Sequence, residues 1–263
     1  MNDDLIARDP AGIKEMFGRI SPRYDLMNRL MTLGMDGGWR RLAAEQAQPA
    51  PGSWVLDACC GTGDLSFALA ERYPSCHVVG LDFVPAMLER ARAKTAKRGG
   101  DRSTPRFIQG DLLALPFPDG IFAAATVGWG VRNVADLRLA FAELTRVTRP
   151  GGRVVCLEST ATQGLPGAGL HDAWMGGVVP ALGRLVTGER HAYRYLPASV
   201  ATFPDAEGLA AIMAGAGLVN VRYRALGMGA VFLHVGEVPT AGERAAPDAD
   251  ARDSGAAGEA PAP

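Results

Sequence analysis

Apolar residues along this chain recur with two alternating periods, one typical of strands and the other typical of helices. Short apolar runs predict seven strands, at 54–56, 77–82, 106–111, 121–128, 153–158, 219–225 and 230–235. Apolar positions at helical spacing predict helices between these strands, at 65–70, 86–93, 134–148 and 205–216. The alternation predicts an α/β fold with a mainly parallel sheet and helices on both faces, and the last two strands predict a closing antiparallel hairpin.

Three stretches fall outside this alternation. Residues 10–47 carry two apolar stripes and predict a helical cap before the first strand, with turns at Ser21-Pro22 and at Gly37-Gly38. Residues 164–200 are too long for a simple connection, so we expect a helical insertion that covers the active site as a lid. From 239 to 263 the apolar period is lost among Ala, Gly, Pro and acidic residues, which predicts a disordered tail.

Composition favours one globular domain over residues 1–238. With 263 residues, 48% of them hydrophobic, the chain is long enough for one α/β domain with a substantial core, or for two small ones. A formal net charge of −1 gives no reason to expect nucleic acid as a partner. No apolar run reaches the roughly 18 residues of a membrane span, and the N-terminus lacks a signal peptide, so we expect a cytoplasmic protein. The four cysteines form no Cys-x-x-Cys pair, so we expect buried thiols and no metal.

The candidate chemistry begins at the end of the first predicted strand. Asp57 closes that strand, and Cys59, Gly61 and Gly63 alternate in the loop that leads into the next helix. Such a strand, glycine loop and helix N-terminus form a nucleotide cradle, because glycines let the backbone approach a ligand closely. A dinucleotide fingerprint would read G-x-G-x-x-G, which this loop does not. The loop resembles instead the first motif of class I S-adenosylmethionine (SAM) methyltransferases, with Cys59 where many carry glycine; an ordinary strand-to-helix turn is the alternative.

Acidic residues also close the next two predicted strands. Asp82 lies 25 positions after Asp57, near the roughly 20-residue offset at which an acid meets ribose hydroxyls in such folds. Its two oxygens can accept from the 2′- and 3′-hydroxyls together. The Asp111 side chain can accept from an adenine amino group while the Leu112 N–H faces the ring. These strand ends predict an adenosine site along the carboxyl edge of the sheet.

Several segments narrow the resemblance to one family. They are Tyr24-Asp25-Leu26-Met27-Asn28, residues 57–64, 114–119, 149–153 and 193–196, and Gly130-Val131-Arg132-Asn133. Together they are similar to the ubiquinone/menaquinone-biosynthesis C-methyltransferase family, from about residue 17 to about residue 235. The resemblance implies a class I SAM-dependent methyltransferase (Rossmann-like) fold. It also implies transfer of a methyl group from SAM to a ring carbon of a polyprenylated quinol.

The resemblance further implies where SAM binds. The family's SAM contacts fall on Thr62, Asp82, Asp111 and Leu112 of this chain. Gly128 departs from the bacterial ubiquinone members, which have Ser there, whereas the Cys59-Cys60 pair and residues 80–83 look more like the demethylmenaquinone branch. Demethylmenaquinol is therefore the expected acceptor, with the benzoquinol of the ubiquinone pathway as a further one. The expected cofactor-binding set is Asp57, Cys59, Gly61, Thr62, Gly63, Asp82, Phe83, Asp111, Leu112 and Gly128.

Arg132 and Asn133 are the candidate catalytic residues. A hydroquinone is about as weak an acid as tyrosine, with a pKa near 10, so it needs help to ionise at neutral pH. Arg132 can stabilise the developing oxyanion, and Asn133 can donate beside it. Arginine is too basic to take the proton, which leaves a water held by Arg132, or His171 or His191, as the acceptor. The expected acceptor pocket consists of Tyr24, Asn28, Trp129 and Tyr195, although Tyr24 and Tyr195 fit equally well as packing aromatics.

Two other functions stay open. One is a SAM methyltransferase for another small or lipid acceptor, and the other is a non-catalytic SAM-binding scaffold of a quinone-biosynthesis complex. The cofactor loop and the polar strand ends favour catalysis. An apolar substrate without a membrane span predicts transient contact with the inner face of the cell membrane, through the N-terminal helices or the insertion. A second copy of the chain, as a homodimer, is one further partner to consider.

Overall fold

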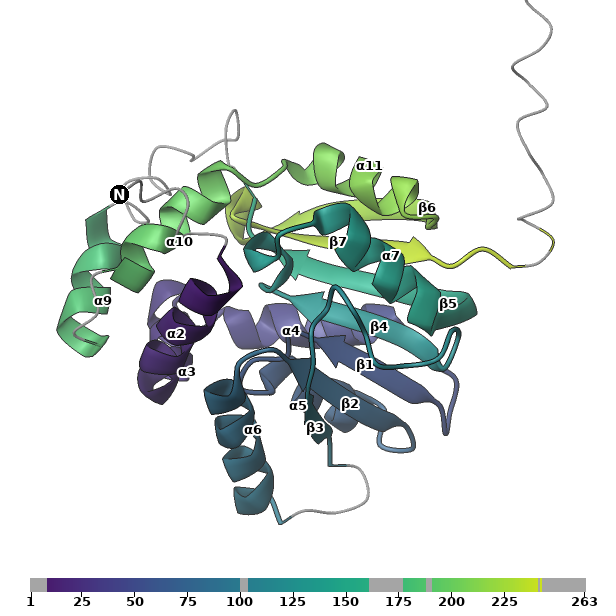
Figure 1. The fold of residues 1–263 in the computed structure, drawn as a ribbon, viewed down its shortest axis with the longest axis horizontal. Helices are drawn as coiled ribbons and strands as arrows, with labels where there is room; N and C mark the ends of the chain where they lie inside the picture. Colours follow the sequence, from purple (N-terminus) through teal and green to yellow (C-terminus); the bar gives the residue numbers. More distant parts are fainter. Residues whose placement is uncertain (1–8, 100–103, 161–176, 188–190, 241, 243–263) are drawn as a thin grey trace, which may run out of the picture.

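The computed structural model of the chain describes residues 9–99, 104–160, 177–187, 191–240 and 242. Within them, seven strands form one sheet in the order β3-β2-β1-β4-β5-β7-β6 (Figure 1). Strands β1 to β5 pair in parallel, and β7 runs antiparallel to both β5 and β6, which confirms the mainly parallel sheet and its C-terminal hairpin. The strands are β1 (Trp54–Ala58), β2 (His77–Asp82), β3 (Arg106–Gln109), β4 (Phe122–Gly128), β5 (Thr148–Glu158), β6 (Val219–Leu226) and β7 (Val231–Glu237).

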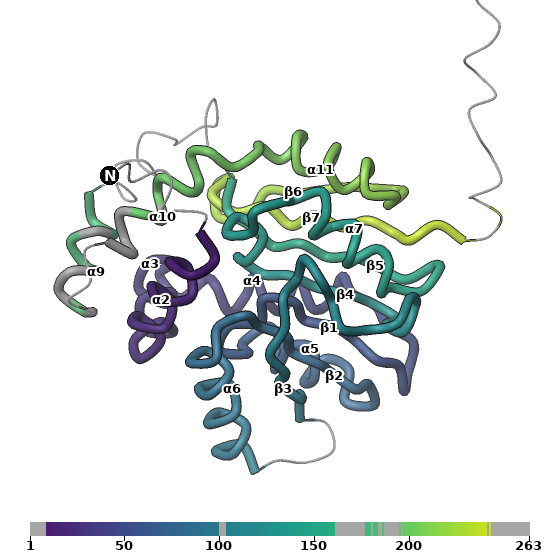
Figure 2. Tube along the Cα trace, viewed as in Figure 1, coloured from purple at the N-terminus to yellow at the C-terminus, as the bar shows by residue number. Residues whose placement is uncertain are grey.

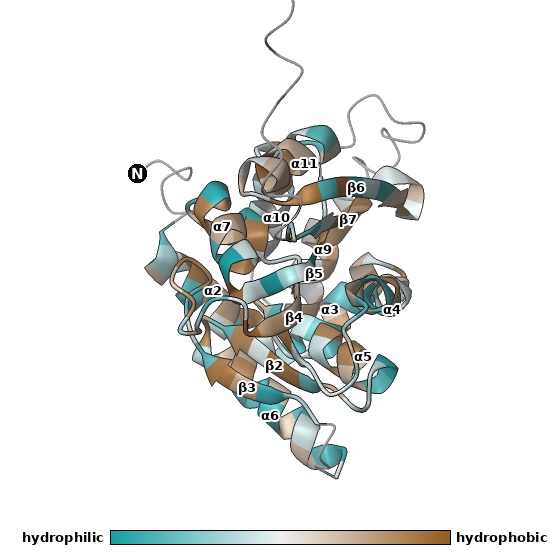
Figure 3. Cartoon of the chain, turned by 90° about the vertical axis from the view of Figure 1, so that its right-hand side faces the viewer, coloured by the Kyte–Doolittle hydropathy of each residue, from teal (hydrophilic) through white to brown (hydrophobic). Residues whose placement is uncertain are grey.

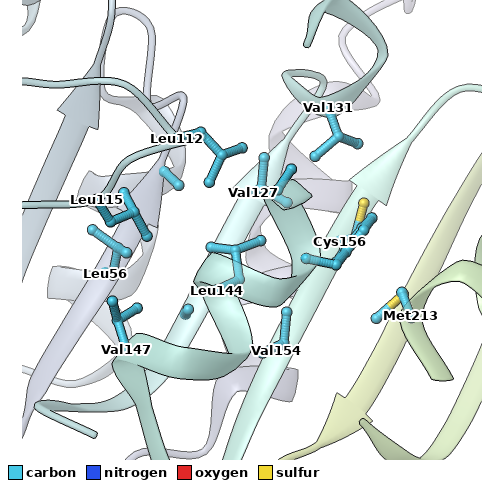
Figure 4. Close-up of a cluster of buried hydrophobic side chains, with 14 of the residues drawn as sticks. Leu56, Leu112, Leu115, Val127, Val131, Leu144, Val147, Val154, Cys156 and Met213 are labelled. Carbon is cyan, nitrogen blue, oxygen red and sulfur yellow. The ribbon is translucent and has the colours of Figure 1, made fainter. Parts of the chain in front are cut away.

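Helices cover both faces of the sheet. Successive residues of a strand point to opposite faces, so each face presents apolar side chains that the helices bury. Val55 belongs to the buried cluster under α4 and α5, whereas Leu56 belongs to the cluster under α7 and α11. Figure 4 shows the second cluster, where side chains of α7 and α11 meet those of β1, β4 and β5. In the hydropathy view of Figure 3, β2 and β4 show much brown, whereas the visible part of β5 is teal to white. These helices are α4 (Asp36–Ala47), α5 (Asp64–Arg72), α7 (Leu137–Val147) and α11 (Ala206–Gly215), and α6 (Pro85–Lys97) packs beside β3.

A separate group of helices lies beyond the carboxyl ends of the strands. Figure 2 shows α2 and α3 beside α9 and α10, although about 150 residues separate the two pairs in the chain. Ile20, Met27 and Val179 form the buried centre of this small cluster. It places residues from two distant parts of the chain over one edge of the sheet. These helices are α2 (Pro10–Ile20), α3 (Tyr24–Met31), α9 (Val179–Thr187) and α10 (His191–Ala201).

Strand β3 ends at Gln109, two residues before the predicted end at Asp111, and two turns also differ from the prediction. Gly37-Gly38 lies inside the first turns of α4, and the chain turns earlier, where Leu33 and Gly34 have φ angles of 51° and 79°. Strand β5 begins at Thr148, before the Pro150-Gly151-Gly152 turn at which a break was expected. The turn forms a bulge within the strand, as the shift in register with β4 between Phe122 and Ala124 shows.

Part of the predicted lid and nearly all of the predicted tail lie outside the described residues. Residues 161–176 and 188–190 of the insertion are among these, as are 241 and 243–263 of the tail. The predicted helical character of the insertion is seen in α9 and α10. Within the described ranges, every helix is too short or too polar to cross a bilayer.

Candidate functional site

A cavity opens at the carboxyl edge of the sheet, between the loops that follow β1 to β4 and the helices α2 and α3. This is the edge at which open α/β sheets bind ligands. The predicted site residues that line it are Tyr24, Cys59, Gly61, Asp82, Phe83, Asp111, Leu112, Gly128, Trp129 and Asn133. The predicted site residues that do not line it are Asn28, Asp57, Thr62, Gly63, Arg132 and Tyr195.

The loop after β1 follows a tight path that brings backbone to the cavity. Cys59, Gly61 and Gly63 have φ angles of 52°, 54° and 86°, in the left-handed region. Gly63 precedes α5, and a Cβ there would lie 2.6 Å from the ring of Phe107, so this position requires glycine. The left-handed φ of Cys59 is unusual for a residue with a Cβ, and such strain is found preferentially at functional sites.

Asp82, at the end of β2, is the buried acid that faces the cavity. Its Oδ2 accepts from the Gly61 N–H at 2.7 Å and its Oδ1 from the Val84 N–H at 2.8 Å. Burial raises the pKa of Asp82, and the backbone hydrogen bonds oppose that rise. Because each carboxylate oxygen has two lone pairs, both oxygens keep the capacity to accept from a ligand hydroxyl.

Asp57, at the end of the neighbouring strand β1, is fully buried beneath the loop. The hydroxyls of Ser66 and Thr126 donate to its carboxylate at 2.5 and 3.1 Å. Burial raises the pKa of Asp57 to about 7, with these hydrogen bonds opposing the rise. The side chain therefore ties α5 and β4 to β1 and supports the loop from below.

The ends of β3 and β4 complete this side of the cavity. Asp111 is exposed, and its Oδ1 accepts from the Leu113 N–H at 2.9 Å, which fixes the carboxylate in a short turn. Leu112 is buried and lines the cavity beside it. Gly128 lines the cavity as well, and a Cβ there would lie 3.3 Å from Leu65.

The turn after β4, η2 (Val131–Asn133), supplies the opposite side of the cavity. Asn133 lines it, and its Oδ1 accepts from the Tyr195 hydroxyl of α10 at 2.9 Å. Arg132 lies behind, where its Nη1 donates to Glu158 Oε1 at 2.7 Å and to the Trp129 carbonyl at 2.8 Å. Burial lowers the pKa of Arg132, but the Glu158 carboxylate together with Tyr24 and Tyr195 raises it more, so the group is a fixed cation.

Tyr24 reaches the same part of the cavity from α3. Burial raises the pKa of its hydroxyl, while the Arg132 cation and a side-chain hydrogen bond with Asn28 lower it. Trp129 lines the cavity next to it, with the Arg40 guanidinium 4.9 Å from its ring centroid. A tyrosine, an indole and an amide thus face a cavity whose other side carries two carboxylates.

Comparison with known proteins shows to which family the chain belongs. The model of the ubiE/COQ5 methyltransferase family matches residues 6–238. The demethylmenaquinone methyltransferase of Thermus thermophilus is 48% identical over 225 residues, which are 85% of this chain and 100% of that protein. The chain belongs to the ubiE/COQ5 methyltransferase family.

Other relatives agree with this membership. The ubiquinone/menaquinone biosynthesis C-methyltransferase UbiE of Desulfotalea psychrophila is 37% identical over 234 residues, 89% of this chain and 93% of that protein. A SAM-dependent methyltransferase of Thermotoga maritima, a solved structure, superposes with a TM-score of 0.59 at 17% identity, covering 85% of this chain and 98% of that one. The protein is a SAM-dependent methyltransferase with the class I fold, as the sequence predicted.

In this ubiE/COQ5 methyltransferase, Thr62 is placed differently from the expected SAM contact. Its hydroxyl donates to Asp25 Oδ1 at 2.5 Å and accepts from Lys94 Nζ at 2.9 Å. Lys94 also pairs with Asp25 at 2.8 Å and with Asp64 at 2.5 Å. The sequence analysis missed this network, which joins α3 to α5 and α6. The Asp25 of the Tyr-Asp-Leu-Met-Asn segment was its one visible signal.

The Arg132 head group also lies elsewhere than expected, because its contacts are with Glu158 and Trp129 and it does not line the cavity. Sequence analysis missed Glu158, which closes β5 as an acid in the same way that Asp57 closes β1. Of the two candidate proton acceptors, His171 lies outside the described residues, and His191 is described only as part of the α10 backbone. The four cysteines are free thiols; Cys60, Cys76 and Cys156 are buried, as expected, and Cys59 is half-buried.

Proposed function

We propose that this protein methylates the ring carbon of a polyprenylated quinol, with demethylmenaquinol as the main acceptor. The observation that carries the proposal is the cavity with two unlike walls. We call Gly61, Asp82, Asp111 and Leu112 the cofactor wall, and Tyr24, Trp129 and Asn133 the acceptor wall. The names of the relatives, demethylmenaquinone methyltransferase above all, support this choice of acceptor.

The residues of the cofactor wall fit SAM. Asp82 faces the cavity with lone pairs left for ribose hydroxyls, and Asp111 is an exposed acceptor one strand away. Leu112 follows Asp111 directly and lines the cavity beside it, where its N–H can donate to an adenine ring. When bound, SAM supplies an activated methyl group. The protein's own part is to hold that group in line with the acceptor carbon, because alignment accounts for much of such a rate enhancement.

The acceptor wall supplies the electrostatic part of the mechanism. A quinol carbon becomes nucleophilic as the neighbouring hydroxyl loses its proton, so negative charge develops on that oxygen. Asn133 can donate to the oxygen, and the Arg132 cation behind it stabilises the charge. Arg132 is too basic to take the proton, so the candidate proton acceptors are a water held by Arg132, His171 and His191.

An exposed apolar face next to the cavity fits a substrate that resides in a bilayer. Leu26, Leu30 and Leu33 follow one another at helical spacing and are 51%, 36% and 72% exposed. Met35 is 44% exposed beside them, and Arg29 is exposed on the same helix. Apolar residues with a neighbouring cation favour an anionic lipid surface, so we propose that α3 and the turn after it touch the membrane transiently.

Flotation with anionic liposomes tests this contact. Leu30→Glu with Leu33→Glu should lose most of the vesicle-bound fraction, whereas a change of the exposed leucine on α7, Leu139→Glu, should keep it. Equal flotation of the two variants would place the contact elsewhere on the molecule.

Mass spectrometry of extracted quinones tests the function itself. A strain that lacks this chain should accumulate demethylmenaquinone, and the wild-type chain should restore the methylated form. Purified protein should transfer label from SAM to the reduced analogue, which separates catalysis from the scaffold alternative. An unchanged quinone pool with methyl loss from another lipid would favour the alternative acceptor class.

A further inference from the structure

Glu158, the last residue of β5, is fully buried. Its Oε1 accepts from Arg132 Nη1 at 2.7 Å and from the Ser159 N–H at 2.9 Å. Its Oε2 accepts from the backbone N–H of Arg132 at 3.4 Å. A buried carboxylate is stabilised only by close pairing and further hydrogen bonds, and here one arginine provides both a side-chain and a backbone contact.

These contacts attach η2 to the end of the neighbouring strand. Arg132 Nη1 donates to the Trp129 carbonyl at 2.8 Å, and Asn133 Nδ2 approaches the same carbonyl at 3.5 Å. Trp129 itself has a left-handed φ of 54°, and its N–H donates to the Leu157 carbonyl at 2.8 Å. Trp129 and Asn133 belong to the acceptor wall, whereas Glu158 does not reach the cavity. The hydrogen bonds of Glu158 therefore reach the acceptor wall through η2.

The Nη1 atom of the Arg132 guanidinium makes the contacts with Glu158 and Trp129, and its Nε is a further donor. Among the described residues, no group accepts from its buried Nε. The Tyr24 and Tyr195 hydroxyls are close enough for their charge states to affect the Arg132 pKa. Tyr24 lines the cavity, and Tyr195 bonds Asn133. The contacts with Glu158 thus fix where the Arg132 cation lies behind the acceptor wall.

We propose that Glu158 is a positioning residue for the methyl transfer. It holds Arg132 and the η2 backbone so that Asn133, Trp129 and Tyr24 present a fixed surface to the acceptor. The inference rests on the proposed function, because a quinol is the acceptor whose developing oxyanion this surface would meet. Because Glu158 acts through Arg132, the fall in kcat caused by a Glu158 substitution should depend on whether Arg132 is present.

A double-mutant cycle tests that dependence. Glu158→Gln and Arg132→Gln are each expected to lower kcat at least tenfold on a reduced demethylmenaquinone analogue with a short prenyl chain, while SAM affinity changes less than twofold. The kcat of the double variant should be no lower than that of the worse single variant, since both substitutions disrupt the same Glu158–Arg132 pair. Glu158→Gln alone leaves an unpaired buried cation, whereas the double variant buries two neutral side chains. The double variant can therefore be measured even if Glu158→Gln alone does not fold. Thr160→Val, a buried polar residue two positions further along, should keep kcat.

Tyr24 gives a readout that needs no acceptor. The charged groups acting on it are Arg132 and Arg40, which lower its pKa, and Asp82, which raises it. Glu158→Gln leaves the Arg132 cation uncompensated, so Tyr24 should ionise at lower pH than in the wild type. Ring-labelled tyrosine followed by NMR, with Tyr24→Phe to assign the signal, measures this shift.

The outcomes separate the two claims. If the wild type does not methylate the quinol analogue, the proposed function fails, and the Tyr24 titration still reads the effect of Glu158. Losses that multiply in the double variant, or an unchanged Tyr24 titration with unchanged kcat in Glu158→Gln, would overturn the positioning role.

Discussion

The two walls of the cavity are built in different ways. On the cofactor wall, each acid accepts from an N–H two positions further along the chain, Val84 for Asp82 and Leu113 for Asp111. Asp82 also accepts from Gly61, in the loop after the adjacent strand β1. On the acceptor wall, the fixing contacts come from distant segments, such as Tyr195 for Asn133 and Glu158 for Arg132. A locally built wall holds its shape with the sheet, whereas a wall built from distant segments depends on how α10 and β5 meet η2. Mutations should therefore separate cofactor binding from turnover.

The largest expected effect concerns stability, at the base of the cofactor wall. The folded pKa of Asp57 is about 7, above its ordinary value of 3.8, because of burial. Below the pKa of Asp57 in the unfolded state, the carboxyl is protonated in both states and the protein has its full stability. As the pH rises from that value to the pKa in the folded state, only the unfolded state loses the proton, so the free energy of unfolding falls. The free energy of unfolding should thus fall between pH 4 and 7, by roughly 4 kcal/mol in total at about 1.4 kcal/mol per pKa unit.

Urea unfolding of Asp57→Asn across that pH range checks this. The variant should lose the pH-dependent fall and be the more stable protein at pH 8. Ser66→Ala removes a hydrogen bond that lowers the pKa, so its fall should move to higher pH. A wild-type curve that rises from pH 4 to 7 would contradict the assignment.

The next effect concerns turnover, on the acceptor wall. Arg132→Ala removes the cation behind Asn133, and kcat should fall by about two orders of magnitude with SAM affinity nearly unchanged. Arg132→Lys should recover only part of the loss, since the point charge of an ammonium does not reproduce the planar guanidinium fork. Steady-state kinetics and calorimetry with SAM separate the two quantities. Near-wild-type kcat in the alanine variant would reduce Arg132 to a structural role.

A smaller effect is expected for the cofactor wall itself. Asp82→Ala loses hydrogen bonds from SAM hydroxyls, each worth roughly 1.5–3 kcal/mol, so SAM affinity should fall at least tenfold. It also releases the Gly61 N–H, so the loop should loosen in the same variant. Titration calorimetry measures this, with Asp119→Asn as a surface control. Unchanged SAM binding in Asp82→Ala would remove the argument for this wall.

The smallest effect concerns the link between the two walls. Lys94→Met breaks the pairs with Asp25 and Asp64 that join α3 to the cofactor loop. Because these side chains are partly exposed, each pair contributes little, and the KM for the quinol should rise only about threefold to tenfold. The kcat should be kept, since Tyr24 would move without leaving the cavity. An unaltered KM would show that α3 is held by its apolar packing alone.

The sequence predicted the cofactor wall better than the acceptor wall, for a physical reason. Asp82 and Asp111 follow strands whose apolar runs are visible, and parallel strands bring their carboxyl ends to one edge. The Tyr195–Asn133 and Glu158–Arg132 contacts join residues 62 and 26 positions apart, and no local pattern encodes such pairing. The Asp57 prediction shows a second limit. Its place at a strand end was correct, but the hydroxyls of Ser66 and Thr126 that enclose it were not foreseen.

The redox form of the acceptor tests the central claim most directly. A quinone ring is electron-poor and will not attack a sulfonium methyl, whereas a hydroquinone that loses a hydroxyl proton puts negative charge on the adjacent ring carbon. The acceptor wall, with Asn133 and the Arg132 cation, favours that ionised form. The measurement is anaerobic transfer of label from SAM to a demethylmenaquinone analogue, reduced with dithionite or held oxidised. The account predicts ring methylation of the reduced form and none of the oxidised form; equal rates on both would contradict it.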